Sequence, residues 1–145
     1  MADNINITEG IGKTLRSKEV GGIHYPVYRT EPDTSGQCET YRNIDMGVTG
    51  ASIKASAGCV YGGDFFNNHA TVARYVKLYD KASAATSGDT PLRTYRIPPN
   101  GGMTFSKAVG ITFTLGISIR ACTGVADNDN TAPSTNDVIV NLDWK

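Results

Sequence analysis

The sequence predicts an all-β fold, an antiparallel β-sandwich of jelly-roll-like type with an extended N-terminal arm. No window of twelve residues carries apolar side chains at the i, i+3, i+4 spacing of an amphipathic helix. Short segments with a strand-like pattern instead recur about every 10 to 20 residues, separated by turn signals, as in sandwiches and jelly rolls. Glycine makes up 16 of the 145 residues, roughly 11% against a usual ~7%, which favours a chain with many turns.

Composition along the chain predicts an arm and a body. Residues 1–40 are predicted to form the N-terminal arm and linker, and residues 41–145 the β-sandwich body. Proline, glycine, aspartate and serine gather in residues 30–40, so these residues are the expected linker. The length of 145 residues and the apolar fraction of 39% suit one domain with one core.

Two parts of the arm have an extended pattern. Residues 1–20 are polar, with Ile5 and Ile7 at strand spacing, and we interpret them as a loose arm or one that depends on a partner. Residues 21–29 form a short aromatic segment. Because Pro26 lacks an N–H group, this segment is expected at a sheet edge or a bulge.

The body has five predicted strands. They are residues 51–59, 71–79, 92–97, 111–119 and 138–144. Polar loops are expected over residues 80–91 and 124–136. The sequence Pro-Pro-Asn-Gly-Gly at residues 98–102 predicts a tight turn, because proline fixes φ and Asn-Gly tolerates positive φ.

The clearest predicted strand is residues 111–119, where apolar residues alternate with small or polar ones. A helix would scatter these apolar residues around its circumference. Residues 138–144 alternate in the same way, with Ile139 as the exception. We therefore expect the odd-numbered face of 111–119 to pack against the even-numbered face of 138–144.

The charge pattern argues against several kinds of partner. The chain has 14 Lys and Arg residues against 14 Asp and Glu residues, with no block of like charges. This balance predicts no nucleic-acid partner and no polybasic membrane contact. No apolar run reaches the ~18 residues that span a bilayer, and no signal peptide is recognised, so we expect neither a membrane partner nor export.

The three cysteines, Cys38, Cys59 and Cys122, are far apart in the sequence and lack CxxC or Cys/His spacing. Their odd number and wide spacing predict free thiols in a reducing cytosol and argue against a structural zinc site. The structural alternative for Cys59 and Cys122 is that they are small apolar residues of strands.

Two segments resemble ligand-binding loops but lack required residues. Residues 10–14, Gly-Ile-Gly-Lys-Thr, look like the end of a phosphate-binding loop, yet Ile7 stands where that loop needs its first glycine, so we interpret them as a structural turn. Residues 127–131 alternate oxygen-bearing side chains as a calcium loop does, but Ala132 and Val138 replace its glycine and glutamate. We interpret them as an acidic surface loop with Asx-type turns, with a loose cation site as the alternative.

No catalytic motif is present. His24 and His69 are the only histidines, and neither has HxxH or HExxH spacing. No GxSxG motif occurs, although a Ser–His–Asp triad is a spatial arrangement that composition does not exclude. We predict no catalytic residue, no cofactor and no metal, and a small hydrolase is the disfavoured alternative. We interpret His24, beside Tyr25, as a contact residue.

The aromatic residues suggest an interface. Seven tyrosines against four phenylalanines form an aromatic set with polar tips, which is typical of interfaces. The residues concerned are Tyr25, Tyr28, Tyr41, Tyr61, Phe65 and Phe66. Ordinary packing within a sheet is the structural alternative.

Several segments together resemble a module of small tailed-bacteriophage structural proteins. They are FFNN at 65–68, RYVKLYDKA at 74–82, DTP at 89–91, the turn at 98–102, GITF at 110–113, GVADND at 124–129 and the ending from 136 to 145, with ITEG at 7–10, GKT at 12–14 and VGGIHY at 20–25 near the start. The resemblance covers about two-thirds of the chain. Its motifs are moderately specific as a set and weak singly.

The resemblance implies a non-enzymatic part of the virion, a capsid decoration (cement) protein that binds and stabilises the outer capsid surface. The alternative is a head-fibre or tail-associated β-sandwich module that binds a host-surface glycan. A decoration protein implies the major capsid protein as partner, the capsid exterior as location, and assembly in the host bacterial cytoplasm. The cytoplasmic origin agrees with the free thiols.

The expected interface lies in the arm. A polar arm with interspersed isoleucines can add a strand to an exposed sheet edge of the capsid, so Ile5 and Ile7 are candidate contacts. His24, Tyr25 and Tyr28 complete the predicted capsid or subunit interface. A closed oligomer multiplies weak contacts through effective concentration, and we expect a homotrimer.

Overall fold

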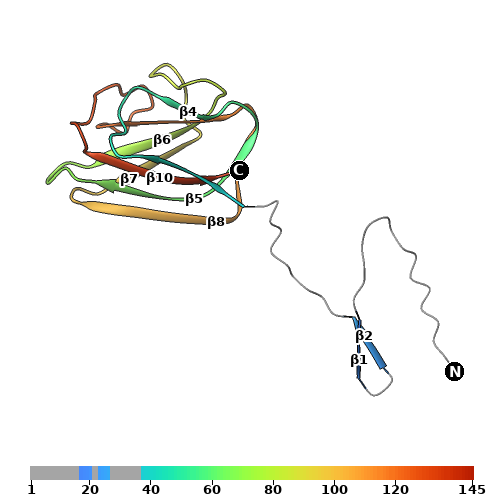
Figure 1. Ribbon diagram of the computed structural model, residues 1–145. Coiled ribbons are helices and arrows are strands. Elements are labelled where there is room, and N and C mark those ends of the chain that lie inside the picture. Colours follow the sequence, from blue (N-terminus) through green and yellow to red (C-terminus); the bar gives the residue numbers. More distant parts are fainter. Residues whose placement is uncertain (1–16, 21–22, 27–36) are drawn as a thin grey trace. The chain divides into compact units, whose positions relative to one another are not determined.

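The computed structural model describes residues 17–20, 23–26 and 37–145 (Figure 1). The chain divides into two units, Met1–Thr34 and Ser35–Lys145. All regular structure in the described residues is β-strand, so the predicted all-β class is confirmed. Within those residues, no helix is long and apolar enough to cross a membrane.

The first unit contributes one antiparallel hairpin. Strand β1 (Ser17–Val20) pairs with strand β2 (Ile23–Pro26), with Ser17 opposite Pro26 and Val20 opposite Ile23. Each strand of a two-stranded sheet is an edge strand, which agrees with the edge position expected for Pro26.

The second unit is a sandwich of two four-stranded antiparallel sheets, which form two layers in Figure 1. One sheet has the order β3-β10-β5-β8 and the other the order β4-β9-β6-β7. In chain order the strands are β3 (Glu39–Asn43), β4 (Ala51–Lys54), β5 (Gly58–Asn67), β6 (Arg74–Asp80), β7 (Arg93–Ile97), β8 (Gly101–Phe113), β9 (Ile117–Cys122) and β10 (Val138–Trp144).

The order of pairing is that of a jelly roll. The first strand of the body pairs with the last, β3 with β10, and the same nesting continues with β4 and β9, β5 and β8, and β6 and β7. The body is therefore one long hairpin folded across itself, and the pairs β10–β5 and β9–β6 complete the two sheets. This topology confirms the predicted jelly-roll-like sandwich.

The hydrophobic core lies between the two sheets, because alternation sends every second side chain of each strand inward. Its buried residues are Met46, Val60, Phe65, Val76, Leu78, Ile97, Phe113, Ile117, Ile119, Ala121, Val138, Val140 and Leu142. The even-numbered face of 138–144 is thus buried as expected. Residues 113, 117 and 119 of the expected odd-numbered face belong to the same core.

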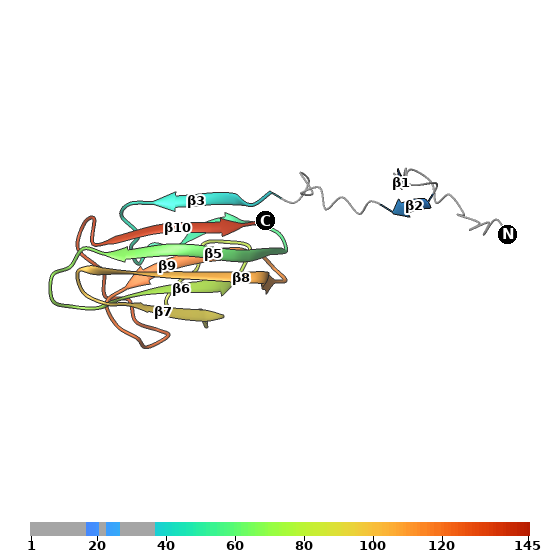
Figure 2. The same ribbon diagram turned by 90° about the horizontal axis from the view of Figure 1, so that it is seen from below.

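The strand connections of the body gather at its two ends. Residues 44–50, 68–73, 98–100 and 123–137 connect strands at one end, which we call the loop end. The chain enters β3 at the opposite end, where the C-terminus also lies (Figure 2).

The prediction of one continuous strand over residues 111–119 is wrong. Strand β8 ends at Phe113 and β9 begins at Ile117 in the opposite sheet. Between them, Leu115 is 63% exposed, and its backbone N–H donates a hydrogen bond to the Asp80 carboxylate (2.7 Å). The alternation hides this turn, because Leu115 continues the apolar pattern through it.

Residues 51–59 also belong to two strands, because β4 ends at Lys54 and β5 starts at Gly58. Residues 61–67 and 101–110 lie in β5 and β8, although their patterns predicted no strand. The remaining predicted strands and both long loops lie close to their expected bounds.

Candidate interaction surface

The predicted interface residues fall in the first unit. Ile5, Ile7 and Tyr28 lie outside the described residues, as does the Gly-Lys-Thr segment at 12–14. His24 and Tyr25 lie in β2, where His24 pairs with Glu19 and Tyr25 pairs with Lys18 of β1. The structure thus places two of the five residues in one hairpin.

Among the described residues, the hairpin is one pair of strands with Val20 opposite Ile23, and neither strand pairs with the body. A two-stranded hairpin by itself is at most marginally stable in water. We therefore expect this hairpin to gain stability from a further surface.

On the body, the outer face of the sheet β4-β9-β6-β7 carries two buried cations. Lys77 of β6 is opposite Arg120 of β9, and each is 0% exposed. The Lys77 Nζ donates a hydrogen bond to the carbonyl oxygen of Ala126. The Arg120 Nη2 donates to Asn130 Oδ1 (2.7 Å). The β9–β10 loop therefore folds over this face and supplies acceptors to both cations, as burial of a charge requires.

Asp129 holds the β9–β10 loop in shape. Its carboxylate accepts hydrogen bonds from the backbone N–H groups of Gly124 (3.2 Å) and Thr131 (3.1 Å). Burial raises the pKa of Asp129, but the hydrogen bonds from the Thr131 and Gly124 N–H groups lower it by more. The pKa of Asp129 therefore lies below its ordinary value. The Asx-type turn predicted in this loop is confirmed. Among the described residues, no group of three or more His, Cys, Asp or Glu could hold a metal ion.

The β6–β7 loop, residues 81–92, covers another part of the same face. The Ala85 N–H donates to Ser118 Oγ of β9 (2.8 Å), and Ala85 is 2% exposed. Asp89 accepts hydrogen bonds from the Lys81 ammonium (2.6 Å) and from the Thr86 N–H (2.7 Å), and these bonds lower the pKa of Asp89 to about 2. Two internally braced loops therefore cover this sheet from outside.

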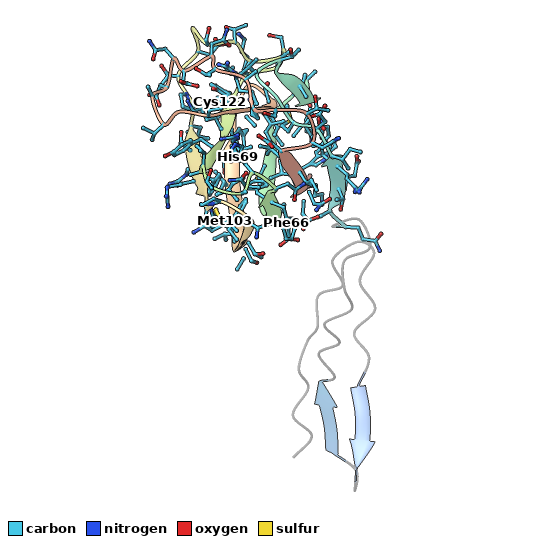
Figure 3. All side chains as sticks on the ribbon, turned by 90° about the vertical axis from the view of Figure 1, so that its left-hand side faces the viewer. Phe66, His69, Met103 and Cys122 are labelled. Carbon is cyan, nitrogen blue, oxygen red and sulfur yellow. The ribbon has the colours of Figure 1, made fainter. Side chains whose placement is uncertain are left out.

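The outer face of the other sheet, β3-β10-β5-β8, has no such cover among residues 37–145. In Figure 3, Phe66 and Met103 lie in this layer, and Cys122 lies in the other. We call this outer surface the open face. Its outward residues align in three rows across the strands: Arg42, Asn141, Asp64 and Thr104; Thr40, Asp143, Gly62 and Ser106; Ile139, Phe66 and Gly102.

Two pairs of side chains on the open face are hydrogen-bonded to each other across strands. Thr104 Oγ1 donates to Asp64 Oδ1 (2.6 Å), and on the adjacent row Thr40 Oγ1 donates to the Asp143 carboxylate (2.9 Å). Phe66 is 46% exposed, and its ring lies so close to Gly102 that a Cβ there would meet it at 3.0 Å. A face with bonded polar pairs and the exposed Phe66 ring is suited to contact with another protein surface.

The predicted aromatic set does not form one interface. Phe65 is 0% exposed and meets the Tyr95 ring edge-on in the core, with ring centroids 5.5 Å apart. Tyr41 packs against the same core, and Tyr61 is half-buried. Phe66, in contrast, lies on the open face. Ordinary sheet packing therefore accounts for Phe65 and Tyr41.

All three cysteines are free thiols, as predicted. Cys38 is exposed, Cys59 of β5 is partly exposed, and Cys122 of β9 is buried. The Cys122 Sγ donates to the carbonyl oxygen of Gly124 (3.2 Å), and burial raises its pKa. The Cys122 thiol is therefore a packed side chain rather than a reactive one.

Sequence reasoning missed the open face, because its rows join residues that are far apart in the chain. Thr40 and Asp143, for example, bond across two strands from opposite ends of the body. The sequence did contain one signal for this face, the polar residues that alternate with apolar ones in the C-terminal strand. Asn141 and Asp143 alternate with buried residues, which places them on an outer face.

Comparisons with known proteins add little to this description. No protein-family model matches the chain, and no curated protein matches it. Among solved structures, the crystal structure of Drosophila melanogaster CENP-C bound to CAL1 contains a similar chain, at 12% sequence identity and a TM-score of 0.25, over 88% of this chain and 73% of that chain. A likeness at this level supports no statement about function.

Proposed function

We propose that this chain is a structural protein of a bacteriophage particle, a decoration (cement) protein that binds and stabilises the outer capsid surface and catalyses no reaction. The resemblance to small tailed-phage structural proteins supports the place in the virion. The jelly-roll body is compatible with a structural role, since this fold recurs in viral capsid domains and in lectins.

The observation that carries the proposal is the contrast between the two outer faces of the body. Loops 81–92 and 123–137 cover one face. Lys77 and Arg120 are buried on this face and donate hydrogen bonds to loop 123–137. The other face is bare among the described residues of the body and presents two hydrogen-bonded side-chain pairs and the exposed Phe66 ring. Such a face can dock on a repeated protein surface without first rearranging.

The N-terminal hairpin supports a second attachment. Strands β1 and β2 pair only with each other within the described residues, so their backbone edges can accept a further strand. Ile5 and Ile7 stay the candidate contacts of the polar arm, with His24, Tyr25 and Tyr28. Two weak attachments on one chain, repeated in a homotrimer, bind far more tightly than either attachment alone.

Binding to empty capsids tests the open face. We would mix the full chain with purified capsids that lack it and measure co-sedimentation. Thr104→Tyr places a bulky ring on the open face, and Thr94→Tyr is the matched control on the outer face of the other sheet, since both threonines are exposed on edge strands. We expect Thr104→Tyr to bind at least about tenfold more weakly, because a clash in a packed interface costs about 1–3 kcal/mol.

The control variant should bind as the unmodified chain does. Equal binding by both variants would remove the open face from the proposal, and no binding by the unmodified chain would remove capsid decoration altogether. Sedimentation equilibrium tests the expected homotrimer separately, and a monomer at working concentration would contradict it. Thermal melts of each variant confirm that loss of binding is not loss of folding.

A further inference from the structure

The loop end carries a depression of about 430 Å³ between the β3–β4 loop and the β9–β10 loop. Figure 3 looks onto this end of the body, where His69 is labelled. Small-ligand sites range from about 300 to 1,000 Å³, so the space suits a small molecule or one residue of a larger one.

Polar groups of the kind that bind hydroxyls line the depression. Asp45, Thr49 and Thr135 are exposed there, and Asn43 is half-buried. One oxygen of Asp45 accepts the backbone N–H of Asn136 (2.6 Å), so the carboxylate is held in place while its second oxygen can accept from a ligand. The rim therefore combines one fixed carboxylate, one amide and two hydroxyls.

Apolar groups supply the rest of the lining. Val48 lines the depression from the β3–β4 loop and Pro133 from the β9–β10 loop, and Met46, which is 2% exposed, belongs both to this lining and to the core. A lining with both hydroxyl-binding and apolar groups matches a sugar ring, whose edge carries hydroxyls and whose faces carry C–H groups.

The β3–β4 wall is held rigidly before any ligand arrives. The Met46 N–H donates to the carbonyl oxygen of Val138 (2.9 Å), and the Gly47 carbonyl oxygen accepts the N–H of Ala121 (2.8 Å). The buried Arg120 donates through Nε to the carbonyl oxygen of Val48 (3.2 Å). A wall that needs no ordering on binding loses less entropy when a ligand binds.

The β9–β10 wall is braced by a buried ion pair. Asp137, 8% exposed, accepts two hydrogen bonds from Arg74, which is 4% exposed (2.6 and 3.0 Å). The same carboxylate accepts the N–H of Ser134 (3.0 Å), next to Pro133 in the wall. Both walls are therefore fixed by buried groups that do not themselves face the ligand space.

Gly47 opens this space. A Cβ built on Gly47 would meet no atom within 4 Å, and its φ is not in the left-handed region. Neighbouring Gly50 differs, because a Cβ there would lie 2.2 Å from the carbonyl oxygen of Ala85. Position 47, which lines the depression, therefore carries no side chain, although the fold has room for one.

We propose that this depression binds a neutral hexose residue of a surface glycan. The Asp45 carboxylate accepts from sugar hydroxyls, Thr49, Thr135 and Asn43 bond the remaining ones, and Val48 and Pro133 pack on the C–H face. The proposal concerns the body alone and does not rest on capsid binding.

Other ligand classes fit less well. No residue lining the depression is Lys, Arg or His, and Asp45 adds negative charge, so anionic sugars and phosphate lack a counter-charge. One carboxylate is too few for a hard cation, which takes six or more oxygen ligands. The Asn43 amide is already bonded to the Asp45 N–H and the Tyr41 hydroxyl, but an extended apolar ligand would still remove water from the Asp45 carboxylate and from the Thr49 and Thr135 hydroxyls.

The test is an NMR titration of the ¹⁵N-labelled full chain. The probes are the methyl glycosides of glucose, mannose, galactose and N-acetylglucosamine, with N-acetylneuraminic acid and inorganic phosphate as anionic comparisons. We expect saturable shifts confined to residues 43–51 and 132–136 with at least one neutral probe, and none with the anions. No saturable shift with any neutral probe, or saturable shifts elsewhere, would overturn the proposal.

Gly47→Val fills the space, and Gly88→Val is its control in the β6–β7 loop, where a Cβ meets only Thr86 Oγ1 at 3.9 Å. We expect Gly47→Val to weaken sugar binding at least about tenfold, the loss that about 1.4 kcal/mol brings, and Gly88→Val to leave it unchanged. If Gly47→Val binds the sugar as tightly as the unmodified chain does, the depression is not the sugar-binding site. Asp45→Asn, which keeps an acceptor for Asn136, should also weaken binding, and its failure to do so would remove the carboxylate's role.

The same variants separate this proposal from capsid decoration. Gly47→Val should co-sediment with capsids as the unmodified chain does, since its substitution lies at the loop end and not on the open face. Sugar binding without capsid binding would leave the site intact and remove the decoration role, and the reverse result would do the opposite.

Discussion

At the scale of residues, the most informative one is Arg120. Its Nε holds the β3–β4 loop through the carbonyl oxygen of Val48, and its Nη2 holds the β9–β10 loop through Asn130 Oδ1. Its neighbour Lys77 bonds the second loop again through Ala126. Two cations at outward positions of adjacent strands therefore organise both walls at the loop end.

Replacing Arg120 by leucine should lower the free energy of unfolding by about 3 kcal/mol, because the part-buried oxygens of Val48, Asp129 and Asn130 lose a charged donor. Arg93→Leu, at an exposed position of β7, should change it by less than about 0.5 kcal/mol. Urea denaturation followed by circular dichroism measures both. Similar values for the two variants would mean that the buried hydrogen bonds of Arg120 contribute no net stability.

Acid should weaken the body through its bonded aspartates. Burial raises the pKa of Asp80, but hydrogen bonds from Thr114, Leu115 and Gly116 outweigh it and lower the pKa from 3.8 to about 2. Burial raises the pKa of Asp137, but the hydrogen bonds from Arg74 and Ser134 and the charge of Arg74 together outweigh burial and lower the pKa. The stability that these groups contribute is present above the unfolded pKa near 3.8 and is lost as pH falls through the lower folded values.

The free energy of unfolding should therefore decrease between about pH 5 and pH 2, because the unfolded chain binds more protons in that window. Denaturant titrations at a series of pH values measure the decrease. Asp80→Asn, whose side chain cannot titrate, should show a smaller decrease than the unmodified chain. A free energy of unfolding that stays constant across this window would contradict the assignment of these carboxylates.

At the scale of elements, close contacts between two backbone segments determine where a strand ends. A Cβ on Gly116 would lie 2.6 Å from the Cα of Ala82, so the β8–β9 turn passes against the β6–β7 loop where no side chain fits. The carboxylate of Asp80 completes this turn by accepting the hydroxyl of Thr114 (2.7 Å). The break in the apparent strand over 111–119 is therefore imposed by a neighbouring loop and not by local propensity.

The β3–β4 loop offers a matched pair of glycines for testing this kind of constraint. Gly50→Ala would place a Cβ 2.2 Å from the Ala85 carbonyl oxygen and should lower the free energy of unfolding by about 2 kcal/mol or more. Gly47→Ala enters open space and should leave it unchanged or raise it by up to about 1 kcal/mol, because alanine restricts the unfolded chain. Thermal unfolding of the two variants compares them directly, and equal midpoints would show that the loop moves away from Ala85.

At the scale of the whole molecule, the two units differ in what stabilises them. The body, Ser35–Lys145, has a core that joins both sheets and includes residues from Met46 to Leu142. The described part of the other unit is one two-stranded hairpin, which is too small to supply a core of its own. Stability should therefore reside in the body and attachment in both units.

Deleting residues 1–34 should leave the midpoint and cooperativity of thermal unfolding unchanged, because every core residue that the structure describes belongs to the body. The same deletion should weaken co-sedimentation with capsids, because it removes the predicted contacts Ile5, Ile7, His24, Tyr25 and Tyr28. Calorimetry of both chains checks the first expectation. A large drop in the midpoint of residues 35–145 would show that the N-terminal unit helps to build the body.

The sequence by itself determined the all-β class, the jelly-roll-like sandwich and the inward face of the C-terminal strand, because period-two alternation records which side of a strand is buried. It also determined the Asx-type turn around Asp129, since that bond spans two residues. Tertiary structure alone decided that residues 111–119 pass between two sheets, that Lys77 and Arg120 are buried, and that no loop within residues 37–145 covers the open face. The physical reason is the same in each case: strand alternation and short-range turns are local, whereas cover by a loop depends on residues that are distant in the chain.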